Sequence, residues 1–128
     1  MKFEDAIPVA APPEAVRAWW TDIDPATVES RDADGSLHIR ARFGAFNVTF
    51  SVREGSWGFW TKAPFGLFVA DEFRVEAAAG GSLLRVDCEV GCRNLLGRVV
   101  LPFYAPVAKR QFMARWREMA EQCAKDCE

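Results

Sequence analysis

Hydrophobic and polar residues alternate with a period of two through most of the middle of the chain. The alternation covers residues 28–31, 37–43, 46–53, 69–76 and 84–92. This period is typical of strands with one buried face. Asp34-Gly35 and Gly80-Gly81 lie between such segments and favour tight turns, so we expect an antiparallel sheet. Further strands are expected over residues 3–10 and 57–62, but the pattern leaves open which face the aromatic residues of 57–62 occupy.

Helical spacing replaces this alternation on either side of the sheet region. Pro12-Pro13-Glu14 ends the first strand and favours a short helix over 15–20, because proline and an acid both suit a first turn. Asp24-Pro25 favours another short turn. Pro102 and Pro106 predict that residues 95–104 form a separate or kinked turn before the last helix. That helix carries an apolar stripe made of Phe112, Met113, Trp116, Met119, Ala120 and Cys123.

The elements together predict an α+β protein with one domain spanning residues 1–128. The sheet has an apolar face that needs a cover, and the last helix offers a matching stripe. A chain of 128 residues is long enough to bury its own core and too short for two ordinary domains.

Several phrases of the sequence resemble one superfamily over essentially the whole chain. They are the opening turn and helix at 9–22, the hairpin of 71–75 with 80–84, and the segment from 96 to 118. They resemble the START/polyketide cyclase-like (SRPBCC) superfamily. The resemblance implies a helix-grip fold: a curved seven-stranded antiparallel sheet around a long C-terminal helix, with short helices after the first strand and an apolar cavity. Members bind lipids, polyketides, aromatic molecules or quinones, and some catalyse cyclisation or dehydration.

The composition is rich in aromatic residues and poor in titratable ones that could catalyse. Five Trp and ten Phe accompany one Tyr and one His. Ligand cavities are mainly apolar, so these residues are candidate cavity walls, although plain core packing explains them as well. The loop with Phe65 and Phe68 is a candidate cavity mouth or lid. The candidate ligand-binding residues are Trp19, Phe50, Trp60, Phe65, Asp71, Phe73, Phe103, Phe112, Met113 and Trp116.

Asp71 is the candidate catalytic residue. It shares the inward phase with Val69, Phe73 and Val75. A carboxyl on an apolar face would have a raised pKa and could donate or accept a proton. In the alternative interpretation the strand begins later and Asp71 caps its exposed end. His38 shares the outward phase with Arg40, which disfavours a histidine-based catalytic site.

The net charge and the spacing of the cysteines limit which binding partners and metal sites we expect. The net charge of −2 and a pI near 5.5 argue against a nucleic-acid partner. Residues 93–128 are basic, which indicates a solvated helix face or a site for an anionic partner. Cys88 and Cys92 would lie about 13 Å apart along a strand, too far for one metal ion. We therefore expect no metal or cofactor, and buried reduced cysteines.

The expected setting is a cytoplasmic protein of a GC-rich bacterium. No segment is apolar enough to span a membrane, and the acidic N-terminus does not resemble a signal peptide. Arginine outnumbers lysine twelve to four. We expect a monomer or homodimer with a hydrophobic small-molecule ligand and no membrane span.

Three functions remain open. The first is binding or transport of a lipid-like or aromatic molecule in an internal apolar cavity. The second is a cyclase or dehydratase that uses Asp71. The third is a protein-interaction module that docks through the basic C-terminal helix. The shortage of titratable residues favours binding over catalysis.

Overall fold

The computed structural model describes residues 1–22, 28–31, 37–43 and 46–128, with residues 28–31, 37–43 and 46–48 described by their backbone only. The chain forms strand β1 (Lys2–Val9), helix α1 (Pro13–Trp20) and six further strands. These are β2 (Val28–Arg31), β3 (Leu37–Phe43), β4 (Phe46–Arg53), β5 (Ser56–Lys62), β6 (Leu67–Ala78) and β7 (Gly81–Cys92). Helix α2 (Leu95–Asp126) completes the chain.

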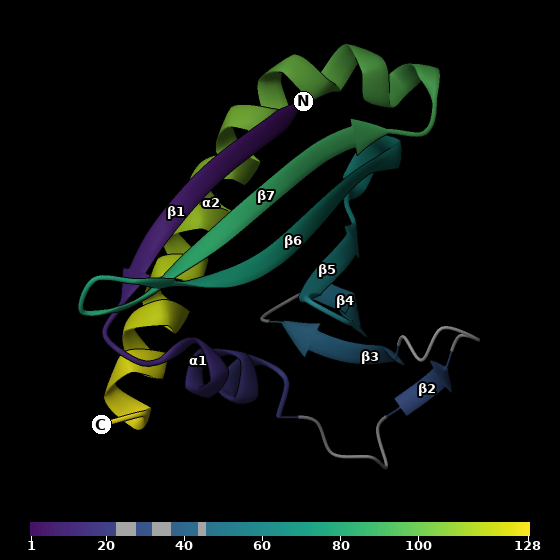
Figure 1. The fold of residues 1–128 in the computed structure, drawn as a ribbon. Helices are drawn as coiled ribbons and strands as arrows, with labels where there is room; N and C mark the ends of the chain where they lie inside the picture. Colours follow the sequence, from purple (N-terminus) through teal and green to yellow (C-terminus); the bar gives the residue numbers. More distant parts are fainter. Residues whose placement is uncertain (23–27, 32–36, 44–45) are drawn as a thin grey trace.

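The strands form one antiparallel sheet in the order β1-β7-β6-β5-β4-β3-β2. Each strand from β2 to β7 pairs with its neighbour in sequence, and β1 closes the other edge by pairing with β7. Local turns therefore build most of the sheet, and a single long-range pairing places β1 beside the last strand. Figure 1 shows the sheet curving beside α2, with α1 near the C-terminal end of that helix.

Helix α2 begins at a side-chain cap and is longer than the strands it covers. The Asn94 side chain accepts a hydrogen bond from the Gly97 backbone N–H at 2.8 Å, which satisfies one free donor of the first turn. Its 32 residues span about 48 Å, whereas the 12 residues of β7 span about 40 Å. The N-terminal half of α2 lies at the end of the sheet away from α1 (Figure 1).

The core lies between the sheet and the helices. Alternation turns Val69, Asp71 and Phe73 of β6 toward the helices and leaves Glu72 and Arg74 exposed. α1 contributes Val16 and Trp20, and the C-terminal half of α2 contributes Phe112, Met113, Trp116, Ala120 and Cys123. These residues belong to one continuous cluster of buried side chains.

The expected α+β class, antiparallel sheet and long C-terminal helix are confirmed. The prediction of a separate turn over 95–104 is wrong, because Pro102 and Pro106 lie inside α2. The helix does bend in its N-terminal third (Figure 1), as the alternative of a kink predicted, since each proline removes one backbone hydrogen bond. The predicted turns at Asp24-Pro25 and Asp34-Gly35 and the orientation of His38 lie outside the described residues.

Candidate ligand-binding site

Asp71 is a carboxyl in an apolar setting beneath α2. Its neighbours in the sheet are Phe59 on β5 and Cys88 on β7. The residue is 4% exposed, and its Oδ1 has no hydrogen-bond partner among the described residues. The structure thus confirms the inward phase and excludes the alternative of an exposed strand cap, because β6 already begins at Leu67.

Burial shifts the ionisation of Asp71 toward neutral pH. Loss of hydration raises the pKa of the Asp71 carboxyl from 3.8 to about 6, although the neighbouring polar groups of Cys88 and Trp116 act in the opposite direction. Near pH 6 the group is therefore half protonated, and it can accept a hydrogen bond when ionised or donate one when protonated.

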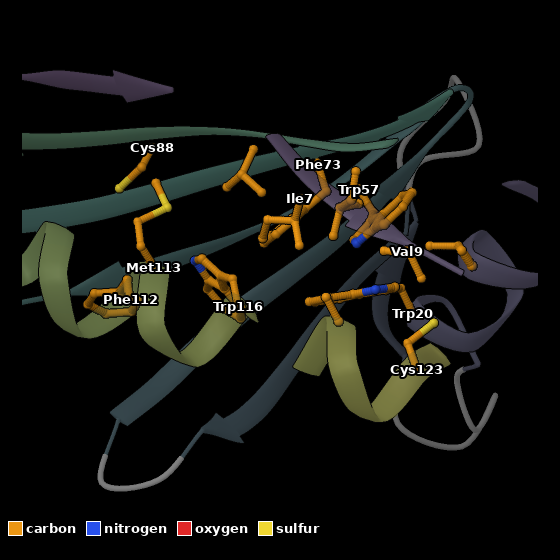
Figure 2. Close-up of a cluster of buried hydrophobic side chains, with 14 of the residues drawn as sticks. Ile7, Val9, Trp20, Trp57, Phe73, Cys88, Phe112, Met113, Trp116 and Cys123 are labelled. Atoms are coloured by element: carbon orange, nitrogen blue, oxygen red, sulfur yellow. The ribbon is translucent and has the colours of Figure 1, made fainter. Parts of the chain in front are cut away.

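Aromatic rings surround this carboxyl on the helix-facing side of the sheet. Trp116 of α2 stacks on Phe59 with centroids 5.1 Å apart and meets Phe73 edge-on at 5.0 Å. Phe59 in turn stacks on Phe50 of β4 at 4.7 Å. Figure 2 shows Phe112, Met113 and Trp116 directed from α2 toward the sheet. We call the following set the aromatic cluster: Trp20, Phe50, Trp57, Phe59, Phe73, Phe112 and Trp116.

Cys88 is the ionisable group placed beside Asp71. Burial and the neighbouring carboxyl both raise the pKa of the Cys88 thiol well above its usual range. The thiol therefore stays protonated at neutral pH and acts as a hydrogen-bond donor, not as a nucleophile. All four cysteines are free in the structure.

Six of the ten predicted binding residues come together in the core. They are Phe50, Asp71, Phe73, Phe112, Met113 and Trp116, all buried. Trp19 lies beside them on α1 but is only partly buried, and its indole N–H donates to Asp126 Oδ2 at 2.8 Å.

The other three predicted residues lie elsewhere. Trp60 is on the outer face of β5, where Arg93 lies 4.6 Å from its ring centroid and Phe68 stacks at 6.2 Å. Phe65 is 57% exposed in the 3-10 turn Pro64–Gly66, and Phe103 is 78% exposed on α2. The structure does not bring these three to Asp71. Strand alternation turns Trp60 away from the core, helix phase turns Phe103 away, and Phe65 lies in a turn with a left-handed backbone.

The predicted list omitted four residues that the structure places at this site. Trp57 and Phe59 share the inward face of β5, a phase that the sequence pattern left open. The ring centroids of Trp20 and Phe73 are 4.9 Å apart, and Cys88 lies opposite Asp71 on the neighbouring strand. The Cys88 position had a signal in the sequence, since the turn at Ala79-Gly80 between Ala78 and Gly81 fixes the register of the β6–β7 hairpin.

A hollow of about 470 Å³ lies on the outer face of the sheet. Its walls carry charges of both signs, such as Arg53, Glu72, Arg74 and Asp87, and Arg74 pairs with Asp87 at 3.0 Å. Asp71 and Cys88 also line it, although alternation turns their side chains to the opposite face. A groove with mixed, partly paired charges and open to water is a weaker candidate for an apolar ligand than the interior.

The described residues form neither a metal-binding cluster nor a membrane-spanning helix. These residues contain no group of three or more His, Cys, Asp or Glu side chains placed to hold a metal ion. No helix among them is long and apolar enough to cross a bilayer.

Several solved structures superpose on this chain and share its architecture. A structural-genomics protein of Mesorhizobium loti superposes with a TM-score of 0.62 at 14% identity, covering 100% of this chain and 99% of that one. The fold is the helix-grip fold. The helix-grip neighbours include a START superfamily protein of Mycobacterium smegmatis, with a TM-score of 0.53, 16% identity and coverage of 94% and 97%. No family model and no curated protein matches the sequence.

Another helix-grip neighbour has a described biosynthetic setting. The di-domain ARO/CYC protein StfQ from the steffimycin biosynthetic pathway superposes with a TM-score of 0.60 at 14% identity, covering 98% of this chain and 50% of that one. Likeness at this identity shows the shared fold. It confirms the resemblance noted in the sequence at the level of architecture, and function must be argued from the site.

Proposed function

We propose that the chain binds a small apolar molecule, lipid-like or aromatic, on the helix-facing side of the sheet beside Asp71. The observation that carries this proposal is the unpartnered Oδ1 of the buried Asp71 carboxyl. A buried polar atom without a partner costs about 1–3 kcal/mol. A ligand with one hydroxyl or amine donor would remove this cost, which gives binding both a site and an orientation.

The aromatic cluster supplies the apolar part of the site. Phe59 faces the helix side and is only partly buried, which makes it the part of the cluster that a ligand could reach first. The Trp116 and Phe50 rings stack on the same Phe59 ring, which prepares flat surfaces for an aromatic or polycyclic body. The helix-grip neighbours described as START and ARO/CYC proteins are consistent with this role at the level of fold.

A cyclase or dehydratase is the second candidate, and the pKa of Asp71 favours it. A carboxyl with a pKa of about 6 can hold or release a proton near neutral pH. However, among the described residues the ionisable group opposite Asp71 in the sheet is the Cys88 thiol, which stays protonated. A binding role needs only Asp71, whereas acid–base catalysis commonly uses a second titrating group, so binding is the better supported proposal.

Native mass spectrometry and a fluorescent probe test the proposal. N-phenyl-1-naphthylamine is apolar and carries a single N–H donor, and 1-phenylnaphthalene has a similar body without that donor. We expect the first probe to bind at neutral pH and to quench tryptophan fluorescence, and the second to compete weakly. A small molecule that co-purifies with the native protein would give the same support.

Matched variants place the probe at Asp71. Asp71→Asn should weaken N-phenyl-1-naphthylamine binding about ten-fold, the size of a hydrogen bond to a charged group. Glu72→Gln on the outer face of the same strand should leave binding unchanged. The proposal fails if neither the probe nor a co-purified molecule binds, or if the two variants behave alike. Recovery of a co-purified molecule in cyclised or dehydrated form would favour the enzyme.

A further inference from the structure

The N-terminal half of α2 carries an apolar stripe on the side that faces away from the core. Leu95, Val99, Phe103 and Val107 recur every four residues and lie one above another on the helix, with Leu96 beside them. Leu95 is 77% exposed and Phe103 is 78% exposed. We call Leu95, Leu96, Val99, Phe103 and Val107 the apolar stripe. It is about 18 Å long.

This concentration of exposed apolar side chains is specific to one end of the molecule. Among the described residues, the large hydrophobic side chains that are exposed all belong to the stripe, apart from Phe65 and Met1. Phe65 lies in the turn against the first turn of α2, where the Arg93 N–H donates to the Gly66 carbonyl at 2.8 Å. The turn that carries Phe65 therefore lies next to the start of α2, where the stripe begins.

The charges around the stripe have a single sign. Residues 90–117 contain no Asp or Glu, and their basic residues are Arg93, Arg98, Lys109, Arg110, Arg115 and Arg117, in a chain with a net charge of −2. Lys109 and Arg110 share a hollow with Glu4 and Asp5 of β1. Arg93 and Arg98 instead line a hollow of about 280 Å³ at the start of α2, together with Cys92, Asn94 and Leu95.

We propose that the apolar stripe and Phe65 dock onto the surface of an anionic lipid bilayer, with Arg93 and Arg98 contacting the phosphate headgroups. An exposed helix face of Leu, Val and Phe flanked by Arg and Lys matches the requirements of the membrane interface. Leu95 and Phe103 enter the acyl boundary from the helix, and Phe65 enters from the adjacent turn. The helix lies in the interface plane and does not cross the bilayer.

Other occupants fit the stripe less well. A symmetric dimer through this face would place the stripe of one copy and its flanking basic residues against the same surface of the other copy, so like charges would repel. The proposal rests on the surface of α2 and is independent of the ligand site at Asp71.

Co-sedimentation with vesicles tests this docking. We expect the full chain to bind vesicles of phosphatidylcholine with 30% phosphatidylglycerol, and to bind pure phosphatidylcholine at least ten-fold more weakly. Binding to the anionic vesicles should fall steeply as NaCl rises from 50 to 500 mM, because salt screens the Arg contribution.

Variants along α2 separate the apolar contribution to vesicle binding from the electrostatic one. Phe103→Ser and Leu95→Ser should each lower vesicle affinity about ten-fold while circular dichroism and Tm stay unchanged. Arg98→Gln should lower it about five-fold, the effect expected for one basic residue near a charged surface. Lys125→Gln removes the same charge from the other end of the helix and should leave binding unchanged.

Four results would overturn the proposal. The first is no sedimentation with anionic vesicles, which would leave a protein partner as the occupant. The second is equal loss of binding in Lys125→Gln and Arg98→Gln, which would indicate nonspecific charge attraction. The third is full binding by Phe103→Ser and Leu95→Ser. The fourth is a dimer in light scattering that Phe103→Ser converts to a monomer, which would assign the stripe to a second copy.

Discussion

The two halves of α2 differ both in the side chains that they turn toward the sheet and in those that they expose to solvent. Residues 109–126 turn Phe112, Trp116 and Cys123 inward and expose mainly charged or polar side chains, as an ordinary amphipathic helix does. Residues 95–108 bury Gly97, Ala105 and Ala108 yet also expose the apolar stripe. The inward residues of the first half are small and those of the second half are large. The comparison indicates that the second half supplies most of the core and that the first half is available for contacts outside the molecule.

The largest test of this comparison removes one aromatic side chain from each half. Trp116 is 1% exposed and contacts Phe59 and Phe73, so Trp116→Ala should lower the free energy of unfolding by about 3–5 kcal/mol. Phe103→Ala removes an exposed ring and should change it by less than about 0.5 kcal/mol. Urea unfolding followed by circular dichroism measures both. Comparable losses in the two variants would contradict the division of roles.

The second test uses Asp71, which is buried beneath α2 and makes the stability of the fold depend on pH. Folding raises its pKa from 3.8 to about 6, so between these values the folded chain binds more protons than the unfolded chain. Stability should therefore be highest near pH 4 with respect to this group and fall as pH rises through 6. The difference between the two pKa values corresponds to a loss of about 3 kcal/mol in the free energy of unfolding.

Asp71→Asn should remove this loss, since an amide of similar shape carries no charge. We expect the variant to be more stable than the native chain at pH 7.5, by up to about 3 kcal/mol, and to approach it near pH 4. Thermal unfolding across this range is the measurement, with Glu72→Gln as the control that keeps the native pH profile. A variant that is less stable than the native chain at pH 7.5 would show that the ionised carboxyl has favourable partners. Higher stability together with lost ligand binding would identify Asp71 as a group retained for function.

The sequence predicted the sheet well because its signals are local. Period-two alternation and the Gly80-Gly81 turn place β6 and β7 within a few residues of their observed bounds and turn Asp71 inward. The observed turn is Ala79-Gly80, one residue before the predicted Gly80-Gly81, and this register places Cys88 opposite Asp71. The faces of β5 were less predictable, because apolar or aromatic residues occur on both, with Phe59 inward and Trp60 outward, and only pairing with β4 and β6 decides between them.

Aromatic character alone does not predict burial along this chain, although Phe65 was expected at a cavity mouth or lid and not in the interior. Phe103 and Phe65 carry the same side chain as Phe112, yet the rotation of α2 and the left-handed backbone of Phe65, with φ of 62°, turn both outward. Helix phase over residues 95–108 could not be set from apolar spacing, because apolar residues lie on both sides of the helix there. The exposed aromatic residues are thus evidence about surface contacts and not about the interior.

The smallest of these tests concerns the cap at the start of α2. Asn94→Ala removes the acceptor for the Gly97 N–H and should lower the free energy of unfolding by about 1 kcal/mol. Because the cap acts on the first turn, amide hydrogen exchange should speed up in residues 95–101 and stay slow around Trp116, where the aromatic cluster holds the helix. Asn94→Asp keeps an acceptor oxygen and should preserve native exchange. If Asn94→Ala instead accelerates exchange evenly to residue 126, the two halves of α2 open as one cooperative unit, and the division between a core-forming half and a contact-forming half would hold for surface chemistry alone.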